Sequence, residues 1–199
     1  MSIEFRNVTK RYGDAKSPLV VKGIDLVVPK GTLTTILGPS GCGKTTTLRM
    51  IAGLIAPDAG RILVDGIDVA AQPQEALARM GVLSDARGLY PRLTARENIV
   101  YYGRLQGLGA DEADERATAL AAMLEMTPLL DRRTDGFSQG ERMKTALARA
   151  LVHDPSHIIL DEPTNGLDVL ATRALRESLR HLRDDHGKCI VFSTHIMQE

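Results

Sequence analysis

Residues 33 to 45 read Leu33-Thr34-Thr35-Ile36-Leu37-Gly38-Pro39-Ser40-Gly41-Cys42-Gly43-Lys44-Thr45. The first five predict a strand that enters a glycine-rich loop directly, and the last eight match the phosphate-binding pattern G-x-x-x-x-G-K-[ST]. In such a loop the glycines let consecutive backbone N–H groups converge on phosphate oxygens. We expect a helix from Lys44 to Ala52, whose N-terminus adds a partial positive charge. The stretch therefore predicts a site for a nucleoside triphosphate.

The loop and the first helical turn supply most of the residues that we expect to contact the nucleotide. Lys44 provides a positive charge for the β- and γ-phosphates, and the hydroxyl of Thr45 can ligate Mg²⁺. The expected contacts in this segment are Gly38, Pro39, Ser40, Gly41, Cys42, Gly43, Lys44, Thr45 and Thr46.

Two adjacent carboxylates, Asp161 and Glu162, follow the short apolar run His157-Ile158-Ile159-Leu160. The run predicts a buried strand. Neighbouring strand side chains point to opposite faces, but at the end of a strand both can border one crevice. We expect Asp161 to hold Mg²⁺ directly or through water, and Glu162 to polarise the attacking water as general base.

The pattern of apolar residues changes along the chain. Residues 3 to about 69 are rich in strand patterns, which include 26–28 and a strand from 61 that ends at an Asp-Gly turn. From about 73 to 151 the pattern is mostly helical, with clear helices at 97–105, 113–124 and 142–152. A further helix at 169–184 joins the strand 157–160 to another at 190–193. Strand–helix–strand units with short links indicate a parallel sheet.

The composition narrows the classes of protein to which this chain can belong. The chain has 199 residues, 43% of them hydrophobic, with 25 basic and 25 acidic residues. Zero net charge, few aromatics and no Trp disfavour a nucleic-acid partner. The two cysteines, Cys42 and Cys189, imply no disulfide framework. We expect no signal peptide at the N-terminus, and no apolar run is long enough to span a bilayer, so spanning helices would belong to another chain.

Two further stretches resemble the ATP-binding cassette (ABC) family of ATPases. The stretch Leu160-Asp161-Glu162-Pro163-Thr164-Asn165-Gly166-Leu167-Asp168 resembles the Walker B motif running into the D-loop, with Asn165 where Ser is commoner. The stretch Phe137-Ser138-Gln139-Gly140-Glu141 resembles the signature L-S-G-G-Q, but Gln139 replaces a glycine and Glu141 replaces the final glutamine. A carboxylate is unfavourable beside phosphate, so we assign Glu141 a capping role in the first turn of a helix.

The resemblance covers essentially the whole chain and implies its fold. The implied fold is an α/β P-loop NTPase with a RecA-like, mostly parallel sheet core. It has an N-terminal antiparallel β subdomain and an inserted α-helical subdomain. We expect one ABC ATPase domain over residues 1–199, with 1–84 and 154–199 as the β subdomain and catalytic core and 85–153 as the helical signature subdomain. Family members usually continue for some tens of residues, so we expect the C-terminal part of the family domain to be missing from this sequence.

The resemblance also implies roles for single residues. His195 would be the switch histidine, which reaches the γ-phosphate and the attacking water, and acts in catalysis with Lys44 and Glu162. Tyr12 would stack on adenine. Asp85 occupies the place of the Q-loop glutamine, which normally contacts Mg²⁺ and the water. An aspartate can still accept hydrogen bonds or bind metal, but it brings a charge and cannot donate when ionised.

The signature loop and the D-loop imply a second cassette. In the family the signature loop caps the γ-phosphate bound to the opposite subunit, with a serine hydroxyl, backbone amides and a helix N-terminus facing an anion. We therefore expect Ser138, Gly140 and Asp168 to contact nucleotide across an interface, in a homodimer or a pair of homologous cassettes.

The function implied is that of the ATP-hydrolysing subunit of an ABC transporter, bound to ATP and Mg²⁺. Residues 87–98 resemble the coupling region of exporters of the sodium-extrusion (ABC-2) type. Integral membrane permease subunits would be its partners, at the cytoplasmic face of the cell membrane. One alternative is a soluble ABC ATPase of translation or DNA repair, although these typically carry two cassettes or a long coiled coil. A small-molecule kinase is another, but it leaves 137–141 and 165–168 unexplained.

Overall fold

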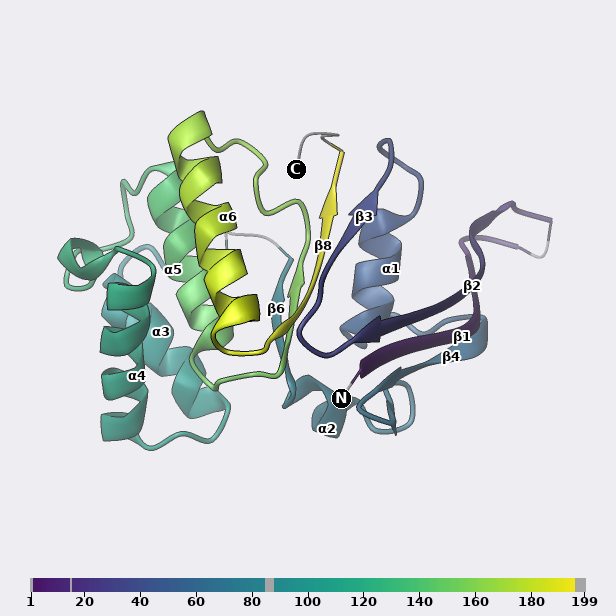
Figure 1. The fold of residues 1–199 in the computed structure, drawn as a ribbon, viewed down its shortest axis with the longest axis horizontal. Helices are drawn as coiled ribbons and strands as arrows, with labels where there is room; N and C mark the ends of the chain where they lie inside the picture. The colour runs from purple at the N-terminus through teal and green to yellow at the C-terminus, as the bar shows by residue number, and fades with distance from the viewer. Residues whose placement is uncertain (1, 15, 85–87, 196–199) are drawn as a thin grey trace.

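The computed structural model describes residues 2–14, 16–84 and 88–195. Two four-stranded sheets form its centre and right-hand side in Figure 1. The N-terminal sheet has the order β2-β1-β4-β5, and its strands pair antiparallel. Its strands are β1 (Ser2–Arg11), β2 (Leu19–Pro29), β4 (Ala59–Val64) and β5 (Ile67–Asp68). The expected Asp-Gly turn joins β4 to β5.

The second sheet is parallel, with the order β3-β8-β7-β6. Its strands are β3 (Leu33–Leu37), β6 (Met80–Leu83), β7 (His157–Leu160) and β8 (Cys189–Thr194). Side chains alternate between its faces. Ile159 and Val191 pack into a core shared with α1 (Lys44–Ile51) and the antiparallel sheet. Ile158 and Ile190 pack on the other face, among the remaining helices.

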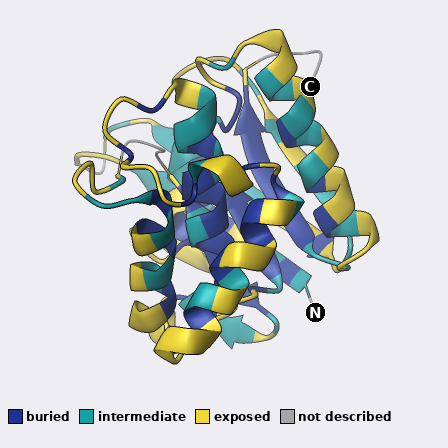
Figure 2. Ribbon diagram, turned by 90° about the vertical axis from the view of Figure 1, so that its left-hand side faces the viewer, coloured by how far each residue is buried: buried dark blue, intermediate teal, exposed yellow. Residues whose placement is uncertain are grey.

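Those helices form a layer of their own at the left of Figure 1. They are α3 (Ala95–Leu105), α4 (Ala110–Met123), α5 (Gln139–Leu151) and α6 (Val169–Asp184). The short α2 (Pro73–Leu77) and a 3₁₀ turn (Thr127–Leu129) complete the set in the described chain. Figure 2 shows helices that turn one buried stripe inward and leave another side exposed, as amphipathic helices do. The helix α5 is instead buried or half-buried along nearly its whole length. This arrangement confirms the expected antiparallel part, parallel core and helical part.

The predicted elements agree with the structure in type and differ at their ends. The helix expected at 169–184 has those bounds, whereas α5 begins at Gln139, three residues earlier than predicted. The strand β6 was not predicted, because its four residues lie inside a region with helical periodicity. A glycine also weakens its strand pattern, yet the fold requires that glycine: a Cβ on Gly81 would lie 2.3 Å from the carbonyl oxygen of Ala150 in α5. The helix packs that closely on the sheet.

Two further properties concern the chain as a whole. Among the described residues, no helix is both long and apolar enough to cross a membrane. Both cysteines are free, Cys42 exposed and Cys189 buried. Burial raises the pKa of the Cys189 thiol to about 11, so that it stays protonated near neutral pH.

Candidate active site

A cavity of about 540 Å³ lies where the parallel strands β3 and β8 end and α1 begins. Ligand sites in open α/β sheets lie in this place, outside the carboxyl ends of the strands. Its walls come from the phosphate-binding loop, from the segments after β7 and β8, and from the N-terminal sheet. The lining residues are Tyr12, Val20, Ser40, Gly41, Gly43, Lys44, Thr45, Thr46, Glu162, Asn165 and His195.

The backbone of the phosphate-binding loop needs its glycines. Gly43 has φ +97° and a Cβ there would lie 2.9 Å from the carbonyl oxygen of Val20, so any side chain would strain the backbone and clash. Gly38 donates its N–H to the carbonyl oxygen of Thr194 at 3.4 Å, which ties the loop to the end of β8. The loop thus follows β3 directly into α1, as predicted, and its conformation depends on contacts with β2 and β8.

Lys44 is almost fully buried, although it carries a charge. Its ammonium donates to the carbonyl oxygens of Gly38 at 2.6 Å and Pro39 at 3.2 Å. It also lies 3.3 Å from Oε1 of Glu162. These partners compensate for the burial, and they hold the positive charge beside the carboxylate at the edge of the cavity.

Thr45 and Asp161 provide oxygen ligands of the kind that Mg²⁺ prefers. The Thr45 hydroxyl donates to Oδ1 of Asp161 at 3.2 Å, which leaves the lone pairs of the hydroxyl oxygen for a cation. Mg²⁺ is usually bound by one or two protein oxygen ligands together with phosphates of the substrate. The pair fits a magnesium ion that arrives with a nucleotide, and the described residues contain no group of three or more His, Cys, Asp or Glu side chains that would hold a metal alone.

Glu162 and His195 meet at the cavity. Nδ1 of His195 donates to Oε2 of Glu162 at 2.6 Å, because an ionised carboxylate can only accept. The other ring nitrogen then remains for a ligand or water. Glu162 has φ +49°, an unfavourable value for a residue with a side chain. This conformation turns its carboxylate towards Lys44 and His195, whereas the preceding Asp161 faces Thr45.

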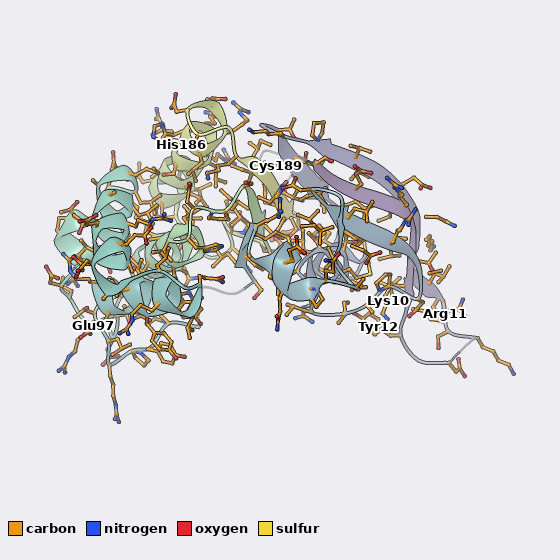
Figure 3. All side chains as sticks on the ribbon, turned by 90° about the horizontal axis from the view of Figure 1, so that it is seen from below. Lys10, Arg11, Tyr12, Glu97, His186 and Cys189 are labelled. Atoms are coloured by element: carbon orange, nitrogen blue, oxygen red, sulfur yellow. The ribbon has the colours of Figure 1, made fainter. Side chains whose placement is uncertain are left out.

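Tyr12 lies at the open end of the cavity, just beyond β1. Figure 3 shows it beside Lys10 and Arg11, and half of its surface is exposed. Its hydroxyl lies 3.4 Å from Oγ1 of Thr46, and Lys10 Nζ lies 5.9 Å from the ring centroid. The ring therefore lies near the first turn of α1, where it lines the cavity.

Ser138, Gly140 and Asp168 do not line this cavity. They line a second one of about 580 Å³, between the N-termini of α5 and α6. The Ser138 hydroxyl accepts from Glu141 N–H at 3.2 Å, and Glu141 Oε2 accepts from Ser138 N–H at 2.7 Å. This bond from the Ser138 backbone is the largest cause that holds the pKa of Glu141 below its usual value. The predicted capping role of Glu141 is confirmed.

Two further predicted residues are Cys42 and Asp85. Cys42 is exposed in the loop, with its side chain against Gly38, and Asp85 lies outside the described residues. Three residues that the sequence patterns did not assign also belong to the site: Val20, Asn165 and Ser193. Asn165 lies within a motif that the sequence shows. Val20 and Ser193 lie on strands without a motif, and only the packing of those strands places them at the site.

Known proteins resemble the chain over nearly its whole length. The profile of the family described as "ABC transporter" matches residues 21–165. The ABC transporter ATP-binding protein NatA of Bacillus subtilis is 45% identical over 99% of this chain and 80% of its own length. The Nod factor export ATP-binding protein I of Burkholderia lata is 42% identical over 99% of this chain, which spans 64% of that relative. The Fe(3+) ions import ATP-binding protein FbpC of Escherichia coli O157:H7 is 36% identical, and the chain spans 56% of it.

Solved structures also match. The dimeric structure of the bacterial ABC transporter cassette MJ0796 superposes with a TM-score of 0.87 at 28% identity, and the match covers 98% of this chain and 89% of that one. A second structure of the same cassette, described as a dimeric post-hydrolysis state bound to ADP and Pi, gives the same values. The order of strands and helices found here is thus that of a family of nucleotide-binding cassettes.

Proposed function

This chain belongs to the ABC transporter family, and we propose that it powers export across a membrane by ATP-driven dimerisation. It is an ATP-binding subunit that hydrolyses ATP to ADP and phosphate. The observation that carries the proposal is the meeting of Lys44, Glu162 and His195 at one cavity of about 540 Å³, beside a loop built for phosphate. The helices between residues 85 and 153 form the part that would pass motion to membrane subunits.

The phosphate loop and α1 would bind the triphosphate. Backbone N–H groups of the glycine-rich loop and the positive N-terminal end of α1 would face the anion, and Lys44 would lie against the β- and γ-phosphates. Thr45 and Asp161 would hold Mg²⁺, which neutralises part of the phosphate charge when bound. Tyr12 would stack on the base, since its half-exposed ring borders the same cavity.

Glu162 would act as the general base. A water between its carboxylate and the γ-phosphate loses a proton to Glu162 as its oxygen attacks phosphorus, and the bond to the ADP oxygen breaks. His195 would orient the carboxylate through Nδ1–H and present its other nitrogen to the water or phosphate. Lys44 would stabilise the charge that develops on the phosphoryl oxygens.

The second cavity would serve a partner cassette. Ser138 and Gly140 lie at the N-terminus of α5, where free N–H groups favour an anion. Asp168 caps α6 at the same cavity by accepting from Ala171 N–H at 2.7 Å. The γ-phosphate bound by the partner would enter here, so two chains would enclose two ATP molecules. The description of solved relatives as dimeric supports this arrangement.

The transporter role would place the chain at the cytoplasmic face of the cell membrane, attached to integral membrane permease subunits. The relatives named for Nod factor export are more similar to this chain than the iron import relative, at 42% against 36% identity. Export is therefore the direction we propose.

A test of the ATP-driven dimer uses Glu162→Gln, which keeps the size of the side chain and removes the base. With Mg-ATP we expect this variant to sediment as a stable dimer, whereas the unmodified chain stays largely monomeric during turnover. Glu177→Gln, on the exposed surface of α6, is the matched control and should behave as the unmodified chain. A Glu162→Gln variant that binds Mg-ATP tightly yet stays monomeric would contradict dimerisation.

The membrane partner is tested by purification of the native protein from detergent-solubilised membranes. Recovery of a multi-span membrane protein in stoichiometric amount supports the transporter. Recovery of ribosomal or DNA-repair proteins in its place favours a soluble ABC ATPase.

A further inference from the structure

Ser193 lies on β8, two residues before His195, and its side chain is fully buried. Its hydroxyl makes two bonds to the acidic pair at the end of β7. It donates to Oδ1 of Asp161 at 2.6 Å and accepts from the backbone N–H of Glu162 at 2.9 Å. One side chain thus contacts both residues to which the metal and the water chemistry are assigned.

The register of the parallel sheet explains this contact. Leu160, the last residue of β7, pairs with Phe192, so Asp161 and Ser193 follow as the next neighbours. Alternation puts both side chains on the face of the sheet that packs on α1, as for Ile159 and Val191 two residues earlier. The N-terminus of that helix carries Thr45, which is why Asp161 receives one hydroxyl bond from the helix and one from β8.

The backbone of Glu162 departs from the sheet at the same point. The N–H of Asp161 still bonds to the carbonyl oxygen of Leu83 in β6, but the N–H of Glu162 bonds to the Ser193 hydroxyl. Glu162 then adopts φ +49°, which L-residues with a side chain adopt only when their surroundings hold them there. The hydroxyl holds the peptide group that precedes this unfavourable conformation.

The two bonds of Ser193 also differ from those of Thr47, Thr134 and Thr145, whose buried hydroxyls each donate to a backbone carbonyl oxygen. Thr47 and Thr145 each donate to a carbonyl oxygen four residues earlier, which is an ordinary bond within the local helical backbone. The partners of Ser193 lie 32 and 31 residues away, directly after the neighbouring strand β7. Satisfying a buried hydroxyl needs only one such bond, so the second is an additional constraint on the site.

We propose that Ser193 is a positioning residue for ATP hydrolysis. A hydroxyl has one proton, and because the Glu162 N–H can only donate, that proton goes to Asp161. The same oxygen therefore fixes the rotamer of the Asp161 carboxylate beside Thr45 and the direction in which the Glu162 carboxylate leaves the sheet. The inference rests on the roles proposed above for Asp161 and Glu162.

The test compares Ser193→Ala with Ser193→Thr in the full chain. Affinity for a fluorescent ATP analogue is measured with EDTA and across a Mg²⁺ titration, together with kcat and KM. For Ser193→Ala we expect unchanged affinity in EDTA, a half-saturating Mg²⁺ concentration raised about tenfold, and kcat lowered by at least as much, as for residues that orient metal ligands. Ser193→Thr keeps the hydroxyl and should restore both quantities to within about threefold of the parent.

Ser178→Ala is the matched control, because its hydroxyl bonds to the Ala174 carbonyl oxygen within its own helix, α6. It should leave the Mg²⁺ titration unchanged. A Ser193→Ala variant that melts earlier but titrates Mg²⁺ and turns over as the parent does would overturn the inference, as would equal losses in the Ala and Thr variants. If the proposed function itself is wrong, the result differs. Either the parent chain hydrolyses no ATP, or the Glu162→Gln substitution causes no loss of ATP hydrolysis.

Discussion

Nδ1 of His195 lies 2.6 Å from Oε2 of Glu162, although 33 positions separate the two residues in the chain. Glu162 follows β7 and His195 follows β8, and these strands are neighbours in the parallel sheet. Parallel strands end at the same edge, so side chains that follow them meet there. The contact places an imidazole where it can orient the Glu162 carboxylate, which we propose as the general base.

The first prediction concerns this imidazole. Because His195 would act by orienting Glu162 through its 2.6 Å bond, we expect His195→Ala to lower kcat for ATP hydrolysis about a hundredfold with little change in KM, as is typical for groups that act in proton transfer. Steady-state phosphate release measures both constants. His186→Ala is the control: that histidine is exposed beyond α6, as Figure 3 shows, and its loss should change neither constant. An unaltered kcat in His195→Ala would exclude the imidazole from the reaction.

The second prediction concerns the base of the nucleotide. We expect Tyr12→Ala to raise the Kd for ATP about tenfold, because loss of a stacking aromatic ring costs about 1–3 kcal/mol per base. Tyr12→Phe keeps the ring and should bind as the parent does, although it loses the 3.4 Å contact to Thr46. Titration with ATP and with inorganic triphosphate separates the base from the phosphates. A rise of equal size for both ligands would contradict stacking.

The third prediction concerns acid stability. His157 is fully buried at the start of β7, and its Nε2 bonds to Oδ1 of Asp65 in the β4–β5 turn at 2.9 Å, while Arg79 and Cys189 lie close to the same pair. Burial lowers the pKa of His157, and it also lowers the pKa of His153, which bonds to the Met80 carbonyl oxygen. Both groups therefore favour folding in their neutral form. Their contribution is complete above the ordinary histidine pKa of about 6.5 and is lost as the pH falls below it.

Urea unfolding between pH 7.5 and 5 measures this effect. We expect the free energy of unfolding to fall by up to about 1.4 kcal/mol per pH unit for each buried histidine. The carboxylates whose pKa is lowered by hydrogen bonds, Glu4, Asp14, Asp58, Glu141 and Asp184, titrate below this range. His157→Asn, which removes the buried imidazole, should flatten the slope. Equal slopes in the parent and in His157→Asn would show that His157 is not one of the groups responsible.

Much of the fold could be predicted from local patterns. The run 33–45 contains a strand, a loop and the start of a helix, each with its own local cause: apolar strand residues, glycines, and a helix that begins at Lys44. The helix over 169–184 was predicted at both ends, and in the structure Asp168 caps its start. The strand β6 could not be predicted, since four residues are too few to show a period and its Gly81 is explained only by the approach of α5.

The sequence by itself determined which residues are candidates for the chemistry, because phosphate loops and acidic pairs after strands are local patterns that can be read without coordinates. The role of Asp85 rests on the sequence resemblance alone and stays a prediction. Tertiary structure alone decided how the pieces meet. Strand order brings β7 beside β8, so that Ser193 reaches Asp161 and His195 reaches Glu162. Such contacts join residues more than 30 positions apart, and sheet register, which no local period encodes, sets their distances.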